Sequence, residues 1–174
     1  MNNLLWIILG ILIVQRVSEL LIARRNEIHM KANGAREFDK SGYKVIVLMH
    51  IGFFISLVSE YILLYGKLNK FWIPLLILFI LAQFLRYWAI GTLGRYWNTK
   101  ILVIPETIPI NRGPYKYVKH PNYIAVITEI AVIPLIFSCY LTAVVFSILN
   151  ILVLRRRIKI EEKALSGAIT DPQL

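Results

Sequence analysis

The stretch "NYIAVITEIAVIPLIFSCYLTAVVFSILNILVL", residues 122–154, decides the fold because it is too long for one membrane crossing. A single helix of these 33 residues would be about 50 Å long, whereas the hydrocarbon core of a bilayer is about 30 Å thick. The run also contains Pro134 and the short stretch "SCY" at Ser138 to Tyr140. Two shorter helices folded as a hairpin therefore fit the sequence better than one long helix.

The composition of the whole chain indicates a membrane protein. Its 174 residues are 57% hydrophobic, and a soluble domain would need more polar residues to cover its surface. Three further apolar segments have the length of a spanning helix, at residues 4–23, 43–65 and 71–93. No basic residue precedes the first segment and no small-residue cleavage pattern follows it, so we expect a retained helix rather than a signal peptide.

The distribution of positive charge supports five crossings. The net charge is +10, and most of the basic residues lie in three segments, 24–44, 95–119 and 155–163, while only Lys67 and Lys70 lie between the second and third spans. Basic residues concentrate on the cytoplasmic side of membranes, and five spans place all three segments there. We therefore predict an all-α integral membrane protein of the cytoplasmic membrane. It has five transmembrane helices, a C-terminal helical hairpin, an outer N-terminus and a cytoplasmic C-terminus.

The chain divides into three parts. Residues 1–93 are expected to form a membrane scaffold of three helices, residues 94–166 to carry the chemistry, and residues 167–174 to form a flexible tail. Because the basic residues are spread over segments that flank the membrane, nucleic acid is not an expected partner. The single cysteine, Cys139, excludes an internal disulfide or a multi-cysteine zinc site, and no metal site is expected.

Two polar segments meet if the hairpin forms. They are "RGPYKYVKHPNY", residues 112–123, and "RIKIEE", residues 157–162. His120-Pro121 predicts a helix start, with free amides near Asn122 and Tyr123 as an anion site. Glu161 faces that site and suits a cation, and tyrosines suit a flat ring. S-adenosylmethionine combines a carboxylate, an ammonium and such a ring.

These segments also resemble a known family. "GPYKYVKHPNY" followed by "RIKIEEKAL" resembles the signature of the isoprenylcysteine carboxyl methyltransferase family, and "RYWAIGTLGRYWNTKI" resembles the start of the same region. The resemblance covers about residues 86–165. It implies an integral membrane methyltransferase that uses S-adenosylmethionine without a Rossmann domain, in keeping with a sequence that has no G-x-G-x-x-G motif.

The resemblance also implies roles for individual residues. Arg157 would be the catalytic residue and face the acceptor. Three positions depart from the family pattern: Lys100 stands where many members have Gln, Lys119 replaces an Arg, and Thr107 replaces a His of eukaryotic members. These departures affect the expected identity of the substrate more than that of the cofactor. The residues implied in cofactor binding are Lys100, Thr107, Ile108, Pro109, Ile110, Tyr115, His120, Pro121, Asn122, Tyr123, Glu161 and Glu162.

Ionisable residues inside the expected spans are candidates for function in their own right. Glu129 lies about two turns inside the fourth helix, and we expect it to line the substrate cavity together with Arg157. Arg16 and Glu19 lie three residues apart and are expected to pair with each other. His50 is expected to be a satisfied core residue.

The resulting hypothesis is methyl transfer from S-adenosylmethionine to an oxygen of a lipophilic small molecule among membrane lipids. Short members of the family resemble bacterial enzymes that methylate long-chain alkylpyrones or related polyketide lipids, so we favour that class and expect coupling to a polyketide synthase. The alternatives are a phospholipid amine, the C-terminal carboxylate of a lipidated peptide, or a non-catalytic transporter or assembly partner. A transporter would carry polar residues at the bilayer midplane, whereas here they gather at one interface.

Overall fold

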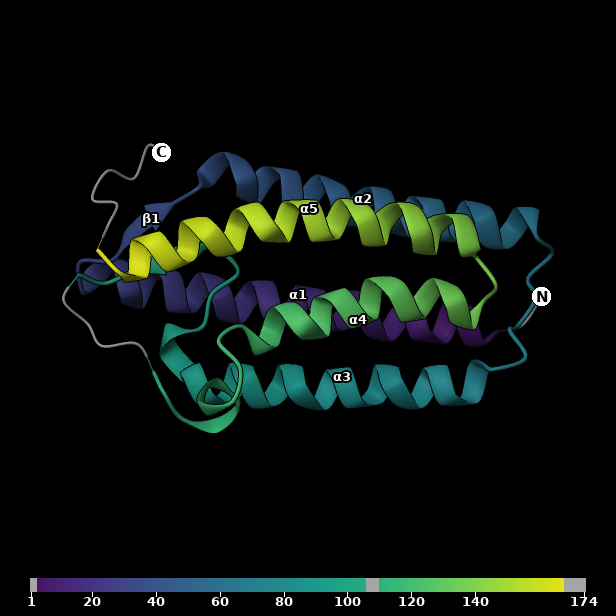
Figure 1. Cartoon of the computed structure of the whole chain (residues 1–174), viewed down its shortest axis with the longest axis horizontal. Helices are drawn as coiled ribbons and strands as arrows, with labels where there is room; N and C mark the ends of the chain where they lie inside the picture. Colours follow the sequence, from purple (N-terminus) through teal and green to yellow (C-terminus); the bar gives the residue numbers. More distant parts are fainter. Residues whose placement is uncertain (1–2, 106–109, 168–174) are drawn as a thin grey trace.

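The computed structural model describes residues 3–105 and 110–167 and shows a bundle of long helices along one axis (Figure 1). The two short strands and the helix-to-helix loops around them lie at one end, here named the loop end, and the α4–α5 turn lies at the other, the far end. The elements are α1 (Leu4–Ala32), β1 (Arg36–Phe38), α2 (Lys40–Leu63), α3 (Trp72–Leu93), η1 (Gly94–Tyr96), β2 (Ile101–Val103), η2 (Gly113–Lys116), α4 (Pro121–Ile136) and α5 (Tyr140–Leu165).

The long apolar run folds as a hairpin at the predicted break. Ser138 has a φ of 57°, in the left-handed region, and Phe137 donates a backbone hydrogen bond to Pro134 at 3.0 Å, which closes α4. The first amides of α5 are satisfied by a side chain from α2, since Glu60 accepts from the amides of Leu141 at 3.0 Å and Thr142 at 2.7 Å. A carboxylate stabilises a helix N-terminus, so Glu60 fixes the hairpin against α2.

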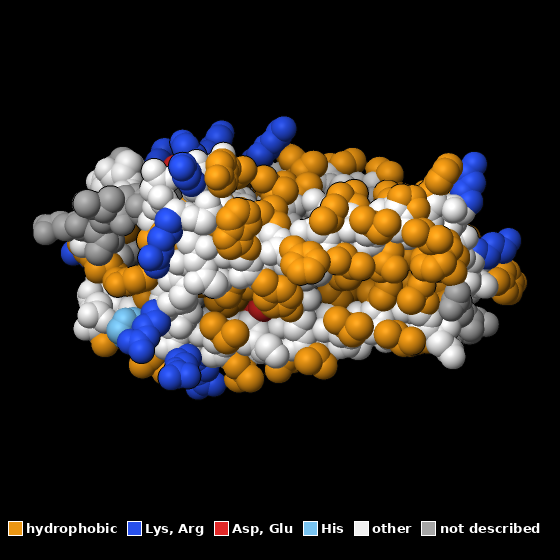
Figure 2. Space-filling view, turned by 90° about the horizontal axis from the view of Figure 1, so that it is seen from below, with side chains coloured by type: hydrophobic (Ala, Val, Ile, Leu, Met, Phe, Trp, Pro, Cys, Tyr) orange, Lys and Arg blue, Asp and Glu red, His pale blue; other side chains and the backbone are white. Residues whose placement is uncertain are grey.

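Three helices are long and apolar enough to cross a membrane: Leu4–Ala32, Lys40–Leu63 and Trp72–Tyr96. Helix α4 has 16 residues and is therefore about 24 Å long, and α5 ends in a charged segment, so the count of five crossings stays a prediction. Figure 2 shows hydrophobic side chains covering the middle of the molecule and Lys and Arg gathered at its ends. Such a surface is typical of a multi-pass membrane protein.

The basic segments share one end of the bundle. Helices α1, α3 and α5 all end at the loop end, so the three basic segments that follow or extend them also lie there (Figure 1). This arrangement is the one that five antiparallel helices require. The side of the membrane that the loop end faces stays a prediction.

The two halves of the bundle are built differently. The far half is a packed hydrophobic core in which Leu5, Leu57 and Phe137 are fully buried and Tyr61 meets Phe137 edge to face at 5.5 Å. In the loop half, polar side chains connect helices to loops. Asn26 of α1, for example, donates to the carbonyl oxygen of Trp97 at 2.7 Å. A close-packed core resists deformation, so the far half holds the helices in place for the more open loop half.

A short antiparallel strand pair ties the loop end together. Phe38 of β1 lies opposite Ile101 of β2, and both side chains are buried. The next residue, Asp39, caps α2 by accepting from the amide of Gly42 at 3.1 Å, and it pairs with Arg156 of α5 at 2.9 Å. The end of β1 and the start of α2 are thus held against the last turns of α5.

Cysteine labelling tests the predicted topology. In a Cys139→Ala background, which removes the buried native thiol, we expect a membrane-impermeant maleimide to label Lys67→Cys in intact cells because this exposed position lies at the far end. We expect Ser166→Cys, at the exposed end of α5, to be labelled only after the membrane is permeabilised.

The two positions serve as each other's control. Labelling of both in intact cells would show an even number of crossings between them, and labelling of Ser166→Cys alone would show the opposite orientation.

Candidate active site

A cavity of about 1400 Å³ opens at the loop end, with walls formed by residues from all five long helices. Its outer part is lined by the loops and by the last turns of α5, and its inner part lies between the helices. Apolar side chains from four of the helices form part of the cavity wall, and charged or polar side chains line both ends. The four apolar residues are Met30, Ile46, Val126 and Leu154, further apolar surface comes from the loops and the helix ends, and the inner polar residues are Arg16, Glu19, His50 and Arg86.

Arg157 is the central cation of the outer part. Its side chain is only 5% exposed; Nε donates to the hydroxyl of Tyr123 at 2.9 Å and Nη2 donates to the carbonyl oxygen of Thr99 at 2.6 Å. Nη1 is buried and has no hydrogen-bond partner within the described residues. Two bonds thus fix the guanidinium plane and leave one edge to donate to a ligand.

Glu161 lies one turn beyond Arg157 on α5 and carries the negative charge of the site. Its carboxylate accepts from the hydroxyl of Tyr123 at 2.5 Å and lies 3.7 Å from Nδ1 of His120. The ring of His120 stacks on Tyr123 with 5.3 Å between centroids, and its Nε2 lies 3.4 Å from the more exposed Glu162. The structure therefore brings together the residues that the sequence placed on the two facing segments.

Tyr115 adds a half-buried aromatic face to the cavity. Burial raises the pKa of Tyr115, and the nearby charge of Glu161 raises it further, so the phenol stays protonated. The turn before it depends on Gly113, whose φ is 57° and where a Cβ atom would meet Oγ1 of Thr92 at 2.4 Å. The Gly-Pro-Tyr turn can lie against α3 only because this position has no side chain.

The start of α4 differs in one respect from the sequence prediction. The helix begins at Pro121, as expected, but the amides of Tyr123 and Ile124 both donate to the carbonyl oxygen of His120, at 3.1 and 3.4 Å. The amide of Tyr123 is therefore not free to bind an anion, and that part of the prediction was wrong. Asn122 lines the cavity, and its buried Oδ1 has no hydrogen-bond partner within the described parts of the chain.

Lys100 lines the cavity but directs its ammonium to two carboxylates. Nζ lies 2.8 Å from Glu27 of α1 and 3.4 Å from Glu37 of β1. Burial alone would lower the pKa of Lys100, but the hydrogen bond to Glu27 and the charge of Glu37 outweigh burial and raise it. Ile110 lies on the cavity wall, whereas Thr107, Ile108 and Pro109 lie outside the described residues.

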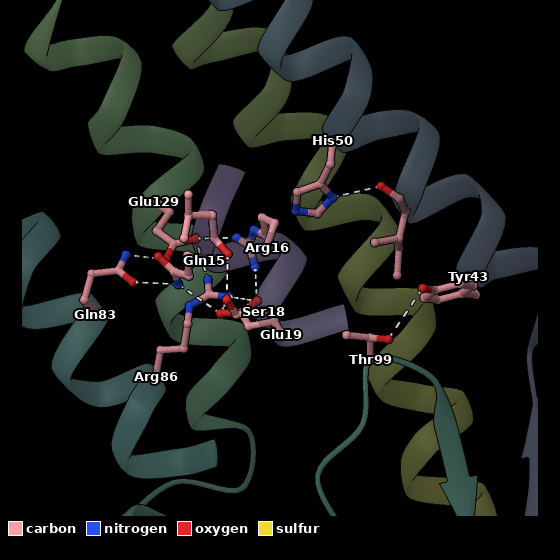
Figure 3. A network of polar contacts seen from close by, with 12 residues as sticks. Gln15, Arg16, Ser18, Glu19, Tyr43, His50, Gln83, Arg86, Thr99 and Glu129 are labelled. Carbon is pink, nitrogen blue, oxygen red and sulfur yellow. Dashed lines mark hydrogen bonds and ion pairs between the residues drawn. The ribbon is translucent and has the colours of Figure 1, made fainter. Parts of the chain in front are cut away.

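Glu129 is buried behind the inner end of the cavity and belongs to what we name the four-charge cluster, Arg16, Glu19, Arg86 and Glu129 (Figure 3). Arg16 bonds to Glu19 at 2.8 Å, as predicted, and also to Glu129 at 2.7 Å. Arg86 bonds to both carboxylates from α3. The three other members of the cluster line the cavity. Glu129 does not, so the prediction that it lines the substrate cavity was wrong; its carboxylate is held by the two arginines instead.

Two groups at this site were not predicted from the sequence. Arg86 is 1% exposed, and a lone arginine within the apolar segment 71–93 was the signal that could have revealed it. Asn98 and Thr99 also line the cavity; Asn98 bonds to the carbonyl oxygen of Ala23 at 2.8 Å, and Thr99 holds Arg157. The sequence signal that could have indicated them is a polar pair directly after the second "RYW" stretch, residues 95–97.

Comparison with known proteins finds relatives in two bacteria. The chain is 47% identical over 160 residues to the uncharacterized protein YpbQ of Bacillus subtilis (strain 168), which covers 92% of this chain and 95% of the relative. It is 31% identical over 156 residues to an uncharacterized protein of Haemophilus influenzae, covering 87% and 88%. No solved structure matches the chain.

The family comparison covers the region that forms the site. The model of the "Isoprenylcysteine carboxyl methyltransferase (ICMT) family" matches residues 75–167, rather more than half of the chain. The matched region includes Arg86, the loop that carries Tyr115, the start of α4 and the α5 residues Arg157 and Glu161. The chain therefore belongs to the isoprenylcysteine carboxyl methyltransferase family, a family of membrane methyltransferases.

Proposed function

We propose that the protein transfers the methyl group of S-adenosylmethionine to an oxygen atom of a lipophilic acceptor, with a long-chain alkylpyrone or related polyketide lipid as the favoured class. The observation that carries this proposal is the arrangement of Arg157 and Glu161 on one face of α5. A fixed cation with a free donor edge lies next to a carboxylate and three aromatic rings, in a cavity with an apolar wall.

The residues present fit the cofactor. The carboxylate of Glu161 suits the ammonium group, and it retains acceptor capacity beyond its bond to Tyr123. The buried Oδ1 of Asn122 can accept a further hydrogen bond. The aromatic faces of His120, Tyr123 and Tyr115 suit both a flat base and a positively charged sulfur. When bound, S-adenosylmethionine supplies a methyl group on a sulfonium, so the leaving thioether needs no proton.

Arg157 favours an oxygen acceptor over an amine. A guanidinium next to the acceptor position stabilises an anionic oxygen and lowers its pKa, and it disfavours a protonated amine by repulsion between like charges. An acidic enol or a carboxylate held at Nη1 already carries the electron pair that attacks the methyl group. Arg157 thus replaces a general base by stabilising the reactive form of the acceptor.

The apolar wall suits the lipid part of the acceptor. Met30, Ile46, Val126 and Leu154 can contact an alkyl chain while the polar head reaches Arg157. These side chains also keep water from the reacting atoms, and the rigid helices hold the two substrates in line. We place the loop end, with the region 94–166, on the cytoplasmic side, where a polyketide synthase could deliver an insoluble acceptor.

Calorimetry tests cofactor binding. We expect the detergent-purified protein to bind S-adenosylmethionine, and Glu161→Gln to weaken binding about 10-fold or more because a charge-assisted hydrogen bond is lost. His120→Ala should also weaken binding, since the aromatic face over Tyr123 is lost.

Glu162→Gln is the matched comparison on the same helix. Its carboxylate is 45% exposed against 28% for Glu161, so we expect a smaller loss. No binding by the wild-type protein would refute the proposed function.

Transfer of a labelled methyl group into lipid extracts tests Arg157. We expect Arg157→Lys to lower kcat/KM about 100-fold or more because a lysine ammonium cannot bond to Tyr123 and Thr99 and still donate to an acceptor. Affinity for S-adenosylmethionine should change much less.

Arg155→Lys is the control because this exposed arginine lies two positions away on the same helix. Equal activity of the Arg157→Lys variant and the wild type would exclude the proposed role, and label found on nitrogen would exclude an oxygen acceptor.

A further inference from the structure

The inner end of the cavity is polar although it lies among the membrane-crossing helices. Arg16 and Glu19 of α1, His50 of α2 and Arg86 of α3 line it. Ionisable side chains are costly in such surroundings and mark functional sites by default. Methyl transfer as described above uses only the outer end of the cavity. The inner end is therefore a second polar region of the cavity, to which the proposed methyl transfer assigns no role.

Arg16 is the most exposed member of the four-charge cluster, and it lines the cavity. Its side chain is 27% exposed, against 1% for Arg86, 5% for Glu19 and 3% for Glu129. The two carboxylates hold it at 2.8 and 2.7 Å, which uses one N–H group on each terminal nitrogen. Each terminal nitrogen carries a second N–H group. Arg16 is thus a rigidly held cation with donor capacity left for a ligand.

His50 contributes an acceptor at the same place. Its Nδ1 lies 2.8 Å from the carbonyl oxygen of Ile46, and because a carbonyl only accepts, Nδ1 must carry the proton. In the neutral ring Nε2 is then an acceptor, and this nitrogen points toward Arg16 (Figure 3). A donor on Arg16 and an acceptor on His50 match a hydroxyl group, which can accept from the first and donate to the second.

The inner end of the cavity lies about one helical turn deeper in the bundle than Arg157, a distance comparable to the width of one six-membered ring. Ile46 and Arg157 together line a small pocket beside the cavity, and His50 follows Ile46 by one helical turn, about 6 Å along the axis.

We propose that Arg16 and His50 bind a second oxygen of the acceptor, a ring hydroxyl that is not methylated. The substrate class is then a lipid whose ring carries two oxygens, one held at Arg157 and the other at Arg16 and His50. This proposal rests on the proposed function of the outer site, because it takes Arg157 as the position of the methylated oxygen.

Binding of two matched probes tests the proposal without turnover. The probes are a pentadecyl resorcinol, with two ring hydroxyls, and meta-pentadecylphenol, with one. Tryptophan fluorescence can report binding because the buried Trp97 lines the cavity. We expect the wild-type protein to bind the resorcinol about 10-fold or more tightly than the phenol, since a site built to bond a hydroxyl rejects the analogue that lacks it.

The variant His50→Phe keeps a ring of similar size but removes Nε2, and we expect it to lose most of the preference for the resorcinol. Ile51→Ala is the control: its side chain is 51% exposed, and we expect the preference of the wild type to persist. Equal affinity of the wild type for the two probes, no binding of either probe, or an unchanged preference in His50→Phe would overturn the proposal.

Calorimetry with S-adenosylmethionine separates this proposal from the proposed function. A wild-type protein that binds the cofactor but not the probes refutes the second oxygen site alone, whereas one that binds only the probes refutes the methyltransferase. Cofactor binding by His50→Phe also shows that this variant is folded.

Discussion

The four-charge cluster of Arg16, Glu19, Arg86 and Glu129 is the constraint on which the arrangement of the helices depends. It joins α1, α3 and α4, and the side chains of Glu19, Arg86 and Glu129 are at most 5% exposed. Each carboxylate contacts both arginines, so removal of any one member would leave an uncompensated buried charge, which is strongly destabilising. The cluster therefore sets the relative positions of three helices and, with them, the inner end of the cavity.

The cavity persists because hydrogen bonds rather than packed side chains hold the loop half of the bundle. Asn26, Asn98 and Arg157 each bond to a backbone carbonyl oxygen on a neighbouring segment. Such bonds have fixed lengths and directions, whereas an apolar interior closes to crystal-like density. The far half does pack in that way and supplies the rigid base. A space large enough for two substrates can therefore exist in a chain of only 174 residues.

The sequence predicts the parts of this structure that follow from chain connectivity. The length of the apolar run requires a hairpin, and the hairpin alone brings His120 close to Glu161. The sequence does not predict that Arg16 contacts Glu129, because the rotation of each membrane helix is set by packing against its neighbours and not by hydropathy. Strands of three residues, such as β1, leave no periodic signal. The amide of Tyr123 was misjudged because the first turn of α4 is tighter than an α-helix.

One face of α5 runs along the cavity. Leu154, Arg157 and Glu161 follow each other at intervals of three or four residues, so they form one line along a rigid helix, and all three line the cavity. In the proposed reaction this line orders the substrates: cofactor at Glu161, acceptor oxygen at Arg157 and the apolar part of the acceptor at Leu154. The separation of cofactor and acceptor is then set by one helical turn, about 6 Å. A helix fixes such a spacing as firmly as a larger domain would, which explains how methyl transfer can do without a nucleotide-binding fold.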